Sequence, residues 1–198
     1  MNKPATFYTV LLVACVLFGA GANCKREDGR LKDFKLGMAF TQKGEIKLTD
    51  QSNRPFSYKK YLGRPALLFF GFTHCPDICP GTLANIARAR KLMKAKPDQL
   101  PVIFVTVDPA RDTPAKIAEY LKKFSIPAAG LTGSEAELEK MAKAFGASFD
   151  KRMLDDKGAY TMDHTAYVYL LDAKGRVRYF FKFKDPPEMI ADIAGSLL

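Results

Sequence analysis

The sequence predicts an α/β fold built on a mixed β-sheet, and three observations lead to that prediction. Two continuous apolar runs, 66–72 and 102–107, have the length and composition of buried strands. A segment with helical spacing of apolar residues follows each run. Near the C-terminus, two more strand patterns are joined by the turn Asp172-Ala173-Lys174-Gly175. We therefore expect a sheet that is parallel in its first half and ends in an antiparallel hairpin, with helices on its faces.

The limits of the helices follow from residues that start and stop them. Pro76 and Pro80 lack a backbone donor and suit an opening helical turn, where that donor has no partner. Ser134 and Glu137 have the spacing of a capping box. The expected elements in chain order are a hairpin of strands 40–42 and 45–49, a strand at 66–72, a helix from the Pro76 turn to Pro97, a strand at 102–107, helices at 113–124 and 134–146, strands at 165–171 and 176–181, and a helix after Pro186-Pro187.

The N-terminal segment has the character of an export signal or a membrane anchor. No charged residue occurs between residues 4 and 23, and the stretch 9–22 is almost wholly apolar. Cys15 and Cys24 each follow a sequence that resembles a lipoprotein cleavage site, so a lipoprotein, a cleaved signal and an uncleaved anchor all remain open. The chain is thus expected to consist of this segment (1–24), a charged tether (25–35) and one domain (36–198). Each outcome places the domain outside the cytoplasm, in a bacterium on the periplasmic side of the inner membrane.

The chain is basic, with a net charge of +10 over 198 residues. Nucleic acid is not expected as a partner, because the lysines are scattered along helix faces without interleaved aromatic residues and because the leader indicates export. A solvated basic surface that favours acidic partners or anionic lipid headgroups is the interpretation we prefer.

Cys75 and Cys79 lie four residues apart where the first apolar run gives way to a helix. At that spacing both sulfurs are expected on one side of the first helical turn. The positive end of a helix dipole favours thiolate, which is the form that attacks disulfides and binds metals. The simpler alternative is a structural disulfide or a pair of small core residues, but a domain of this size seldom needs a disulfide to fold.

His164 is the residue that could complete a metal site with the two cysteines. In the predicted strand order, the loop that contains it returns beside the cysteine turn. Two thiolates and one imidazole select copper, above all Cu(I), and zinc is the competitor. An iron-sulfur cluster is disfavoured because the other two cysteines belong to the leader. His74 ranks below His164 because it is expected to point away from Cys75.

Two methionines near the predicted site, Met153 and Met162, could add thioether contacts to a metal. We interpret both as packing or loop residues.

At these residues the chain closely resembles the SCO/SenC family, thioredoxin-like copper proteins that help assemble the Cu(A) centre of cytochrome c oxidase. The resemblance runs from about Ile46 to the C-terminus. It is carried by segments 71–80 (GFTHCPDICP), 107–114 (VDPARDTP), 130–133 (GLTG), 163–165 (DHT) and 169–172 (YLLD).

The resemblance implies a thioredoxin-like fold with an added N-terminal β-hairpin. It also implies that Cys75, Cys79 and His164 bind copper, with Asp77 and Asp163 nearby. The implied partners are the Cu(A)-bearing subunit of cytochrome c oxidase and another copper chaperone. The cluster Asp108-Arg111-Asp112 matches the family's pattern, and we interpret it as an ion-paired loop and helix cap beside the site.

Three functions are compatible with these residues. The first is a membrane-tethered copper chaperone without enzymatic turnover. The second is a thiol-disulfide oxidoreductase in which Cys75 and Cys79 cycle to keep a partner's copper-binding cysteines reduced. The third, a thiol peroxidase that uses Thr73 and Arg111, is disfavoured by spacing. The chaperone is preferred because dithiol exchange has no need of His164.

Overall fold

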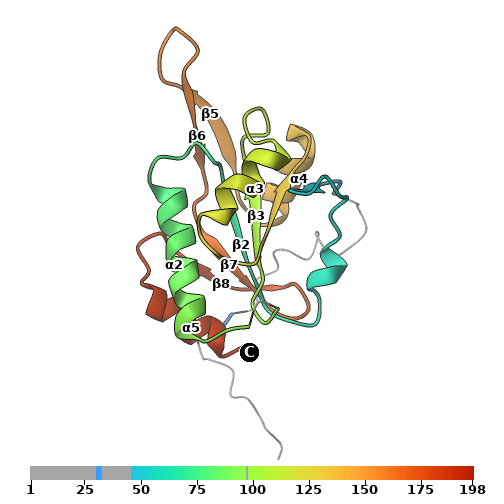
Figure 1. Cartoon of the computed structure of the whole chain (residues 1–198), viewed down its shortest axis with the longest axis vertical. Coiled ribbons are helices and arrows are strands. Elements are labelled where there is room, and N and C mark those ends of the chain that lie inside the picture. The colour runs from blue at the N-terminus through green and yellow to red at the C-terminus, as the bar shows by residue number, and fades with distance from the viewer. Residues whose placement is uncertain (1–29, 33–45, 97) are drawn as a thin grey trace, which may run out of the picture.

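A mixed six-stranded sheet forms the centre of the molecule (Figure 1). The structure, a computed structural model, describes residues 30–32, 46–96 and 98–198. The strand order is β1-β4-β3-β2-β7-β8, in which β2, β3 and β4 are parallel and their outer neighbours are antiparallel. The strands are β1 (Thr49–Asp50), β2 (Ala66–Gly71), β3 (Val102–Thr106), β4 (Ala128–Thr132), β7 (Val168–Leu171) and β8 (Val177–Phe181). The predicted mixed sheet with its C-terminal hairpin is confirmed.

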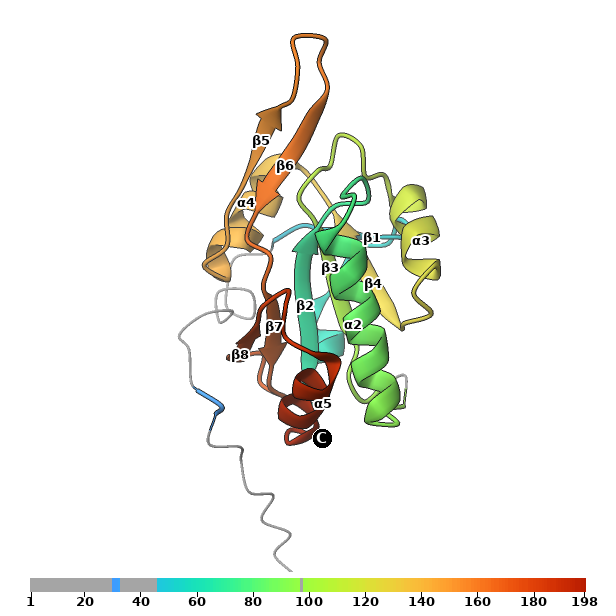
Figure 2. The same cartoon turned by 90° about the vertical axis from the view of Figure 1, so that its left-hand side faces the viewer.

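Helices cover both faces of this sheet, which is why its central strands are apolar on both sides. They are α2 (Ile78–Leu92), α3 (Pro114–Lys122), α4 (Glu135–Ala144) and α5 (Pro187–Gly195). On one face Phe104 of β3 packs against Phe69 and against Tyr120 of α3. On the other face Phe70 packs against Phe145 at the end of α4. Figure 2 shows α2 and α5 side by side, both in front of the sheet.

The caps of two helices were predictable from sequence. The Thr113 hydroxyl accepts the Lys116 N–H at the start of α3, and the Ser134 hydroxyl accepts the Glu137 N–H at the start of α4. The second bond of the predicted capping box, from the Ser134 N–H to the Glu137 carboxylate, is replaced by another bond. The Glu137 carboxylate accepts the backbone N–H of Lys47 at 2.7 Å, because the segment that leads into β1 runs past this helix end.

Strand β4 was not predicted, although its GLTG segment was noted. The sequence Ala-Ala-Gly-Leu-Thr has few of the β-branched and aromatic residues that mark strands. Its glycine serves close packing: a Cβ on Gly130 would lie 2.1 Å from Cγ2 of Ile117 and 2.7 Å from Cδ1 of Leu121, both on α3.

The expected strand at 165–171 begins later than predicted, because only Val168–Leu171 forms a strand and residues 165–167 connect it to the preceding strand. The chain forms β6 (Tyr160–His164), turns, and then enters the main sheet as β7. Strand β6 pairs with β5 (Phe149–Met153) in a separate two-stranded sheet that projects away from the body of the molecule (Figure 1). This hairpin was not predicted, because most of β5 is exposed and carries no apolar alternation.

The N-terminal segments are described only in part. The first arm of the predicted hairpin, 40–42, lies outside the described residues. Among the described residues of the second arm, 45–49, only Thr49 is in a strand, the two-residue β1, which pairs with β4. A tight turn follows it, in which Asp50 N–H binds the Arg54 carbonyl and Phe56 N–H binds the Leu48 carbonyl.

The predicted leader lies outside the described residues, and of the tether only Arg30–Lys32 are described. The Lys32 N–H donates to the Arg178 carbonyl on β8 at 2.9 Å. None of the helices in the described part of the chain has the length and apolar character that a bilayer crossing requires.

Candidate metal centre

The two cysteines lie beyond the C-terminal end of β2, on either side of the point where α2 begins. The helix starts at Ile78, so Cys79 is in its first turn and Cys75 precedes it. The expectation that both sulfurs leave the helical turn itself is therefore wrong for Cys75. The sulfurs are close for a different reason, because the Cys79 N–H donates to Cys75 Sγ at 3.4 Å. That N–H is one of the helix-start donors without an intrahelical partner, and Asp77 at the N-cap makes no side-chain cap bond.

The surroundings of Cys75 favour its thiolate form. Hydrogen bonding from the Cys79 side chain is the largest influence, and together with the backbone N–H groups of Cys79 and Asp77 it lowers the pKa of Cys75 to about 5, although burial acts in the opposite direction. Cys75 is half-buried, so a partner or a metal ion can reach its sulfur. Both cysteines are free thiols in this structure.

Cys79 is the buried member of the pair. Its hydrogen bond to Cys75 and its burial both raise the pKa of its thiol, because each favours the protonated sulfur. The sulfur fits above β2 because residue 71 is glycine: a Cβ there would lie 3.0 Å from Cys79 Sγ and 2.8 Å from Cε1 of Phe69. The close approach of helix and strand thus depends on Gly71.

His164 reaches the cysteines from the end of β6. Its Nε2 lies 3.7 Å from Cys79 Sγ, and its Nδ1 lies 3.1 Å from the carbonyl oxygen of Thr165. Because a carbonyl only accepts, Nδ1 carries the proton and Nε2 keeps its lone pair toward the sulfur. The ring is packed edge-on against Phe69 and Phe72. Burial lowers the pKa of His164, which favours the neutral imidazole that binds metals.

The arrangement offers two sulfur atoms and one imidazole nitrogen around Cys79, which contacts both other residues, although the three ligand atoms do not all lie within 4.8 Å of one another. This donor set suits a soft ion such as Cu(I), and its sulfur content disfavours Mg²⁺ and Ca²⁺. The structure places Cys79 beside each of the other two predicted ligand residues, and the role of all three as ligands remains a prediction.

The other candidate ligands lie differently. The half-exposed His74 directs Nδ1 to the Thr73 hydroxyl at 3.1 Å and lies 3.8 Å from an Asp112 oxygen. Met153 is exposed, and Met162 is packed against the core. The Asp163 carboxylate pairs with Arg152 at 2.8 Å, with both side chains 57% exposed. A direct influence of that carboxylate on a metal ion is therefore weakened by solvent.

The loop between β3 and α3 supports the cysteine turn. Asp112 is fully buried, and its carboxylate accepts hydrogen bonds from the Thr73 N–H at 3.0 Å, the Thr73 hydroxyl at 2.6 Å and the Thr106 hydroxyl at 2.6 Å. Asp108 forms an ion pair with Arg111, as predicted. The prediction that one of these aspartates caps the helix is wrong, because Thr113 caps α3.

The carboxylates of this loop already serve the protein as hydrogen-bond acceptors. One ligand atom each from His74, Asp108 and Asp112 lies within 4.8 Å of the others. The carboxylate oxygens, however, already accept from hydroxyl, backbone and guanidinium donors of the protein.

Sequence reasoning missed several residues around the site. Tyr160 contacts the Asp108 loop, and the rings of Phe69 and Phe72 enclose His164. The even spacing of Tyr160 and His164 along a strand is the one sequence signal that could have indicated a shared face.

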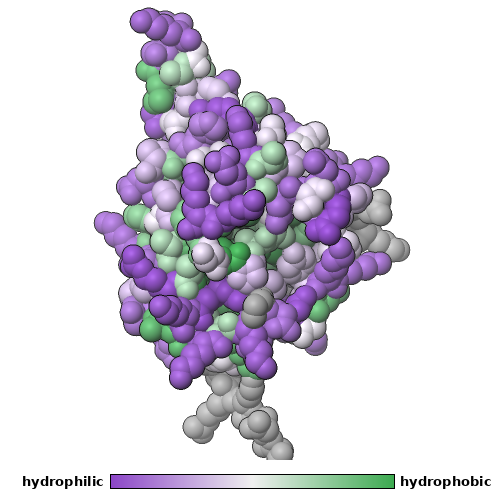
Figure 3. Space-filling view, viewed as in Figure 1, coloured by the Kyte–Doolittle hydropathy of each residue, from purple (hydrophilic) through white to green (hydrophobic). Residues whose placement is uncertain are grey.

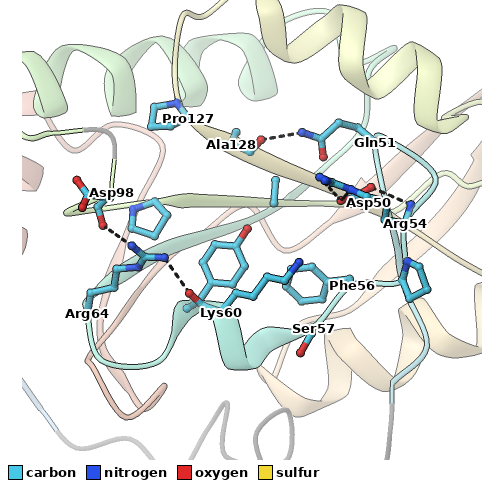
Figure 4. A pocket seen from close by; sticks show the side chains of 14 residues that line it. Asp50, Gln51, Arg54, Phe56, Ser57, Lys60, Arg64, Asp98, Pro127 and Ala128 are labelled. Atoms are coloured by element: carbon cyan, nitrogen blue, oxygen red, sulfur yellow. Dashed lines mark hydrogen bonds and ion pairs between the residues drawn. The ribbon is translucent and has the colours of Figure 1, made fainter.

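A pocket of about 460 Å³ lies elsewhere, between the 3-10 helix η1 (Tyr58–Tyr61) and the edge of β4 (Figure 4). It contains none of the predicted ligands. Its arginines are engaged by the protein: Arg54 pairs with Asp50, and Arg64 donates to the carbonyls of Lys60 and Asp98. Figure 3 shows hydrophilic residues over most of the face in view, with apolar residues in scattered patches, as expected for a solvated surface.

Comparisons with known proteins identify the family. The family model described as SCO1/SenC matches residues 37–198. A SCO2-like protein of Rickettsia conorii is 39% identical over 150 residues, which are 74% of this chain and 73% of that protein. The structure of Bradyrhizobium japonicum ScoI with copper bound superposes with a TM-score of 0.71 at 41% identity, over 78% of this chain and 98% of that one.

The fold is likewise that of the thioredoxin-like Sco structures. BsSco, described as having a disulfide switch and as a member of the Sco family of cytochrome c oxidase assembly proteins, superposes with a TM-score of 0.63 at 21% identity, over 86% of this chain and 98% of that one. At that identity the likeness bears on the fold alone. The family match over 162 of the 198 residues shows that the chain belongs to the SCO1/SenC family.

Proposed function

We propose that this protein is a copper carrier that takes part in the assembly of cytochrome c oxidase, with the Cu(A)-bearing subunit as the recipient of its copper. The observation that carries the proposal is the contact of Cys79 with both other candidate ligands: its N–H lies 3.4 Å from Cys75 Sγ and its Sγ lies 3.7 Å from Nε2 of His164. Membership of the SCO1/SenC family and the copper bound by Bradyrhizobium japonicum ScoI support it.

Each residue has a distinct part in taking up the ion. Cys75, half-exposed and with a pKa near 5, supplies a thiolate that meets copper first. Neutral His164 offers the Nε2 lone pair without losing a proton. Cys79 must give up its proton when copper binds, so binding releases a proton and becomes weaker as the pH falls. A recipient that offers its own thiolates can then exchange ligands with the exposed Cys75.

We further propose that the domain is tethered to a membrane on its extracytoplasmic side. The apolar segment at 1–24 supports this, and a basic surface favours an anionic membrane. Another copper chaperone would deliver the ion.

A second candidate function is reduction of a partner disulfide, and the unequal thiols favour it. The Cys75 thiolate would attack one partner sulfur, which releases the other as a thiolate that takes up a proton. Cys79, after losing its proton, would attack Cys75 Sγ of the mixed disulfide, which releases the second partner thiol and leaves a Cys75–Cys79 disulfide. Two electrons pass to the partner. His164 takes no part in these steps.

The test therefore compares His164→Ala with Cys75→Ser and Cys79→Ser, and uses His74→Ala as the matched histidine control. Loss of one ligand from three should weaken copper binding by about a hundredfold in His164→Ala, and His74→Ala should bind normally. Cells that carry only His164→Ala should lose assembled oxidase and regain part of it when copper is added. If these cells keep normal oxidase while cells with either serine variant lose it, the protein acts as a reductase and the carrier proposal is wrong. Absence of copper from the reduced wild-type protein after anaerobic loading would refute the carrier outright.

A further inference from the structure

The strand that carries His164 has little support from the main sheet. Among the strands that the structure describes, β5 and β6 pair only with each other, and the hairpin projects from the body (Figure 2). A two-stranded hairpin alone is at best marginally stable in water. The position of His164 relative to the cysteines must therefore depend on contacts between β6 and the rest of the protein.

Tyr160 makes such contacts at the start of β6. Its hydroxyl donates to an Asp108 oxygen at 3.0 Å, and its carbonyl accepts from Nη1 of Arg111 at 3.1 Å. The Arg111 guanidinium lies over the Tyr160 ring, 3.8 Å from its centroid, and the Lys151 ammonium lies 3.9 Å from the same centroid. One tyrosine is thus held through its hydroxyl, its ring and its backbone.

The partners of Tyr160 belong to the loop that also supports the cysteine turn. Asp108 is 2% exposed, its N–H donates to the Thr106 hydroxyl, and its carbonyl accepts the N–H of Asp112. Asp112 in turn holds Thr73, two residues before Cys75. The loop 108–112 therefore makes hydrogen bonds both to the strand that carries His164 and to the turn that carries the cysteines.

Tyr160 and His164 lie on the same face of β6, so the position of one side chain constrains the position of the other. Side chains alternate along a strand, so residues 160, 162 and 164 share one face, and Met162 on that face packs against the core. The Arg111 guanidinium also lies 5.8 Å from the ring centroid of Phe72, which packs against the imidazole. Two routes thus connect Arg111 to His164, one along the strand and one through an aromatic ring.

We propose that Asp108, Arg111 and Tyr160 are positioning residues that hold His164 Nε2 against Cys79 Sγ. They bind no metal themselves. The inference rests on the proposed copper site, and it adds that the affinity of that site depends on a latch formed by these three residues at the loop end of the β5–β6 pair. Loss of the latch should leave the cysteine pair intact and should weaken the contribution of the histidine.

The test is a double-mutant cycle between Tyr160 and His164, read out as Cu(I) affinity by competition with a chelator. Tyr160→Leu should weaken Cu(I) binding by about ten- to a hundredfold, the effect expected when the group that orients a metal ligand is lost. In a His164→Ala background the same change should have no further effect, because the ligand through which Tyr160 acts is gone. Tyr167→Leu is the matched control, an exposed tyrosine on the other side of His164, and should bind Cu(I) normally.

A second readout needs no copper. In the reduced, metal-free protein, nuclear Overhauser contacts between the His164 ring and the rings of Phe69 and Phe72 should weaken in Tyr160→Leu and persist in Tyr167→Leu. If Tyr160→Leu does not fold, Tyr160→Phe, which removes only the hydroxyl bond to Asp108, replaces it and should show the same pattern with a smaller effect. Arg111→Lys should recover part of the affinity lost in Arg111→Met.

The outcomes separate this inference from the proposed function. Equal losses of affinity in the wild-type and His164→Ala backgrounds, or no loss in either, would overturn the latch while leaving copper binding in place. If the wild-type protein binds no Cu(I), the carrier fails, and the Overhauser contacts alone decide whether Tyr160 positions His164.

Discussion

Replacement of the buried Asp112 should destabilise the protein in a graded way that its hydrogen bonds determine. The carboxylate accepts three hydrogen bonds, two from Thr73 and one from the Thr106 hydroxyl. Asp112→Ala leaves all three donors without their acceptor, and with about 1–3 kcal/mol for each buried donor, partly offset by water, we expect a loss of about 3–5 kcal/mol.

The isosteric Asp112→Asn should cost less. Its amide oxygen can still accept the Thr73 N–H and the Thr106 hydroxyl, and its NH₂ can donate to the Thr73 hydroxyl, which can turn toward His74 Nδ1. Only the charge assistance is lost, so we expect about 1–2 kcal/mol.

The assay is urea-induced unfolding of the reduced protein, with Asp156→Ala, an exposed aspartate in the loop between β5 and β6, as a control that should change stability by less than about 0.5 kcal/mol. An alanine variant no less stable than the asparagine variant would refute this account of the loop.

Three further predictions concern the site. Because the pKa of Cys75 is about 5, its alkylation rate in the metal-free protein should stay level between about pH 6 and 8. An ordinary thiol of pKa about 8.5 reacts about tenfold faster for each unit of pH in this range. A tenfold rise in the rate of Cys75 per pH unit would contradict the lowered pKa. Gly71→Ala and Gly130→Ala should each cost about 1–3 kcal/mol by overpacking, but only Gly71→Ala should also weaken copper binding, because its methyl group would displace the Cys79 sulfur. Copper at a free concentration a hundred times its Kd should raise the unfolding free energy by about 2.7 kcal/mol, and a chelator should remove this gain; an unchanged unfolding curve would mean that the folded state does not bind copper preferentially.

The central strands could be predicted because burial on both faces leaves a plain signal in sequence. The runs at β2 and β3 are apolar throughout, since helices cover both sides of the sheet. β4 left no such signal, because Gly130 is selected for close contact with α3 rather than for strand propensity. The hairpin of β5 and β6 was not predicted for the opposite reason: most of its residues are exposed and pair with each other, and a few, among them Tyr160 and Met162, contact the body of the protein.

The candidate site was predictable to the extent that strand order determines it. A turn after β2 and a loop before β7 must meet, because β2 and β7 are neighbours in the sheet. The order of the strands could not reveal which atoms support the site. The bonds of Asp112 to Thr73 and of Tyr160 to Asp108 join residues 39 and 52 positions apart, and they depend on side-chain geometry that neither spacing nor composition encodes.

The sulfur of Cys75 occupies the place that a serine or aspartate oxygen usually takes at the start of a helix, since it accepts the Cys79 N–H at the beginning of α2. Serine at position 75 can accept the same N–H through its hydroxyl, whereas alanine cannot. The serine variant therefore changes the chemistry of the group and preserves the helix start, while the alanine variant removes both. A functional loss in Cys75→Ser can thus be assigned to the thiol itself, and the difference in stability between Cys75→Ser and Cys75→Ala measures what a sulfur atom contributes as a helix cap.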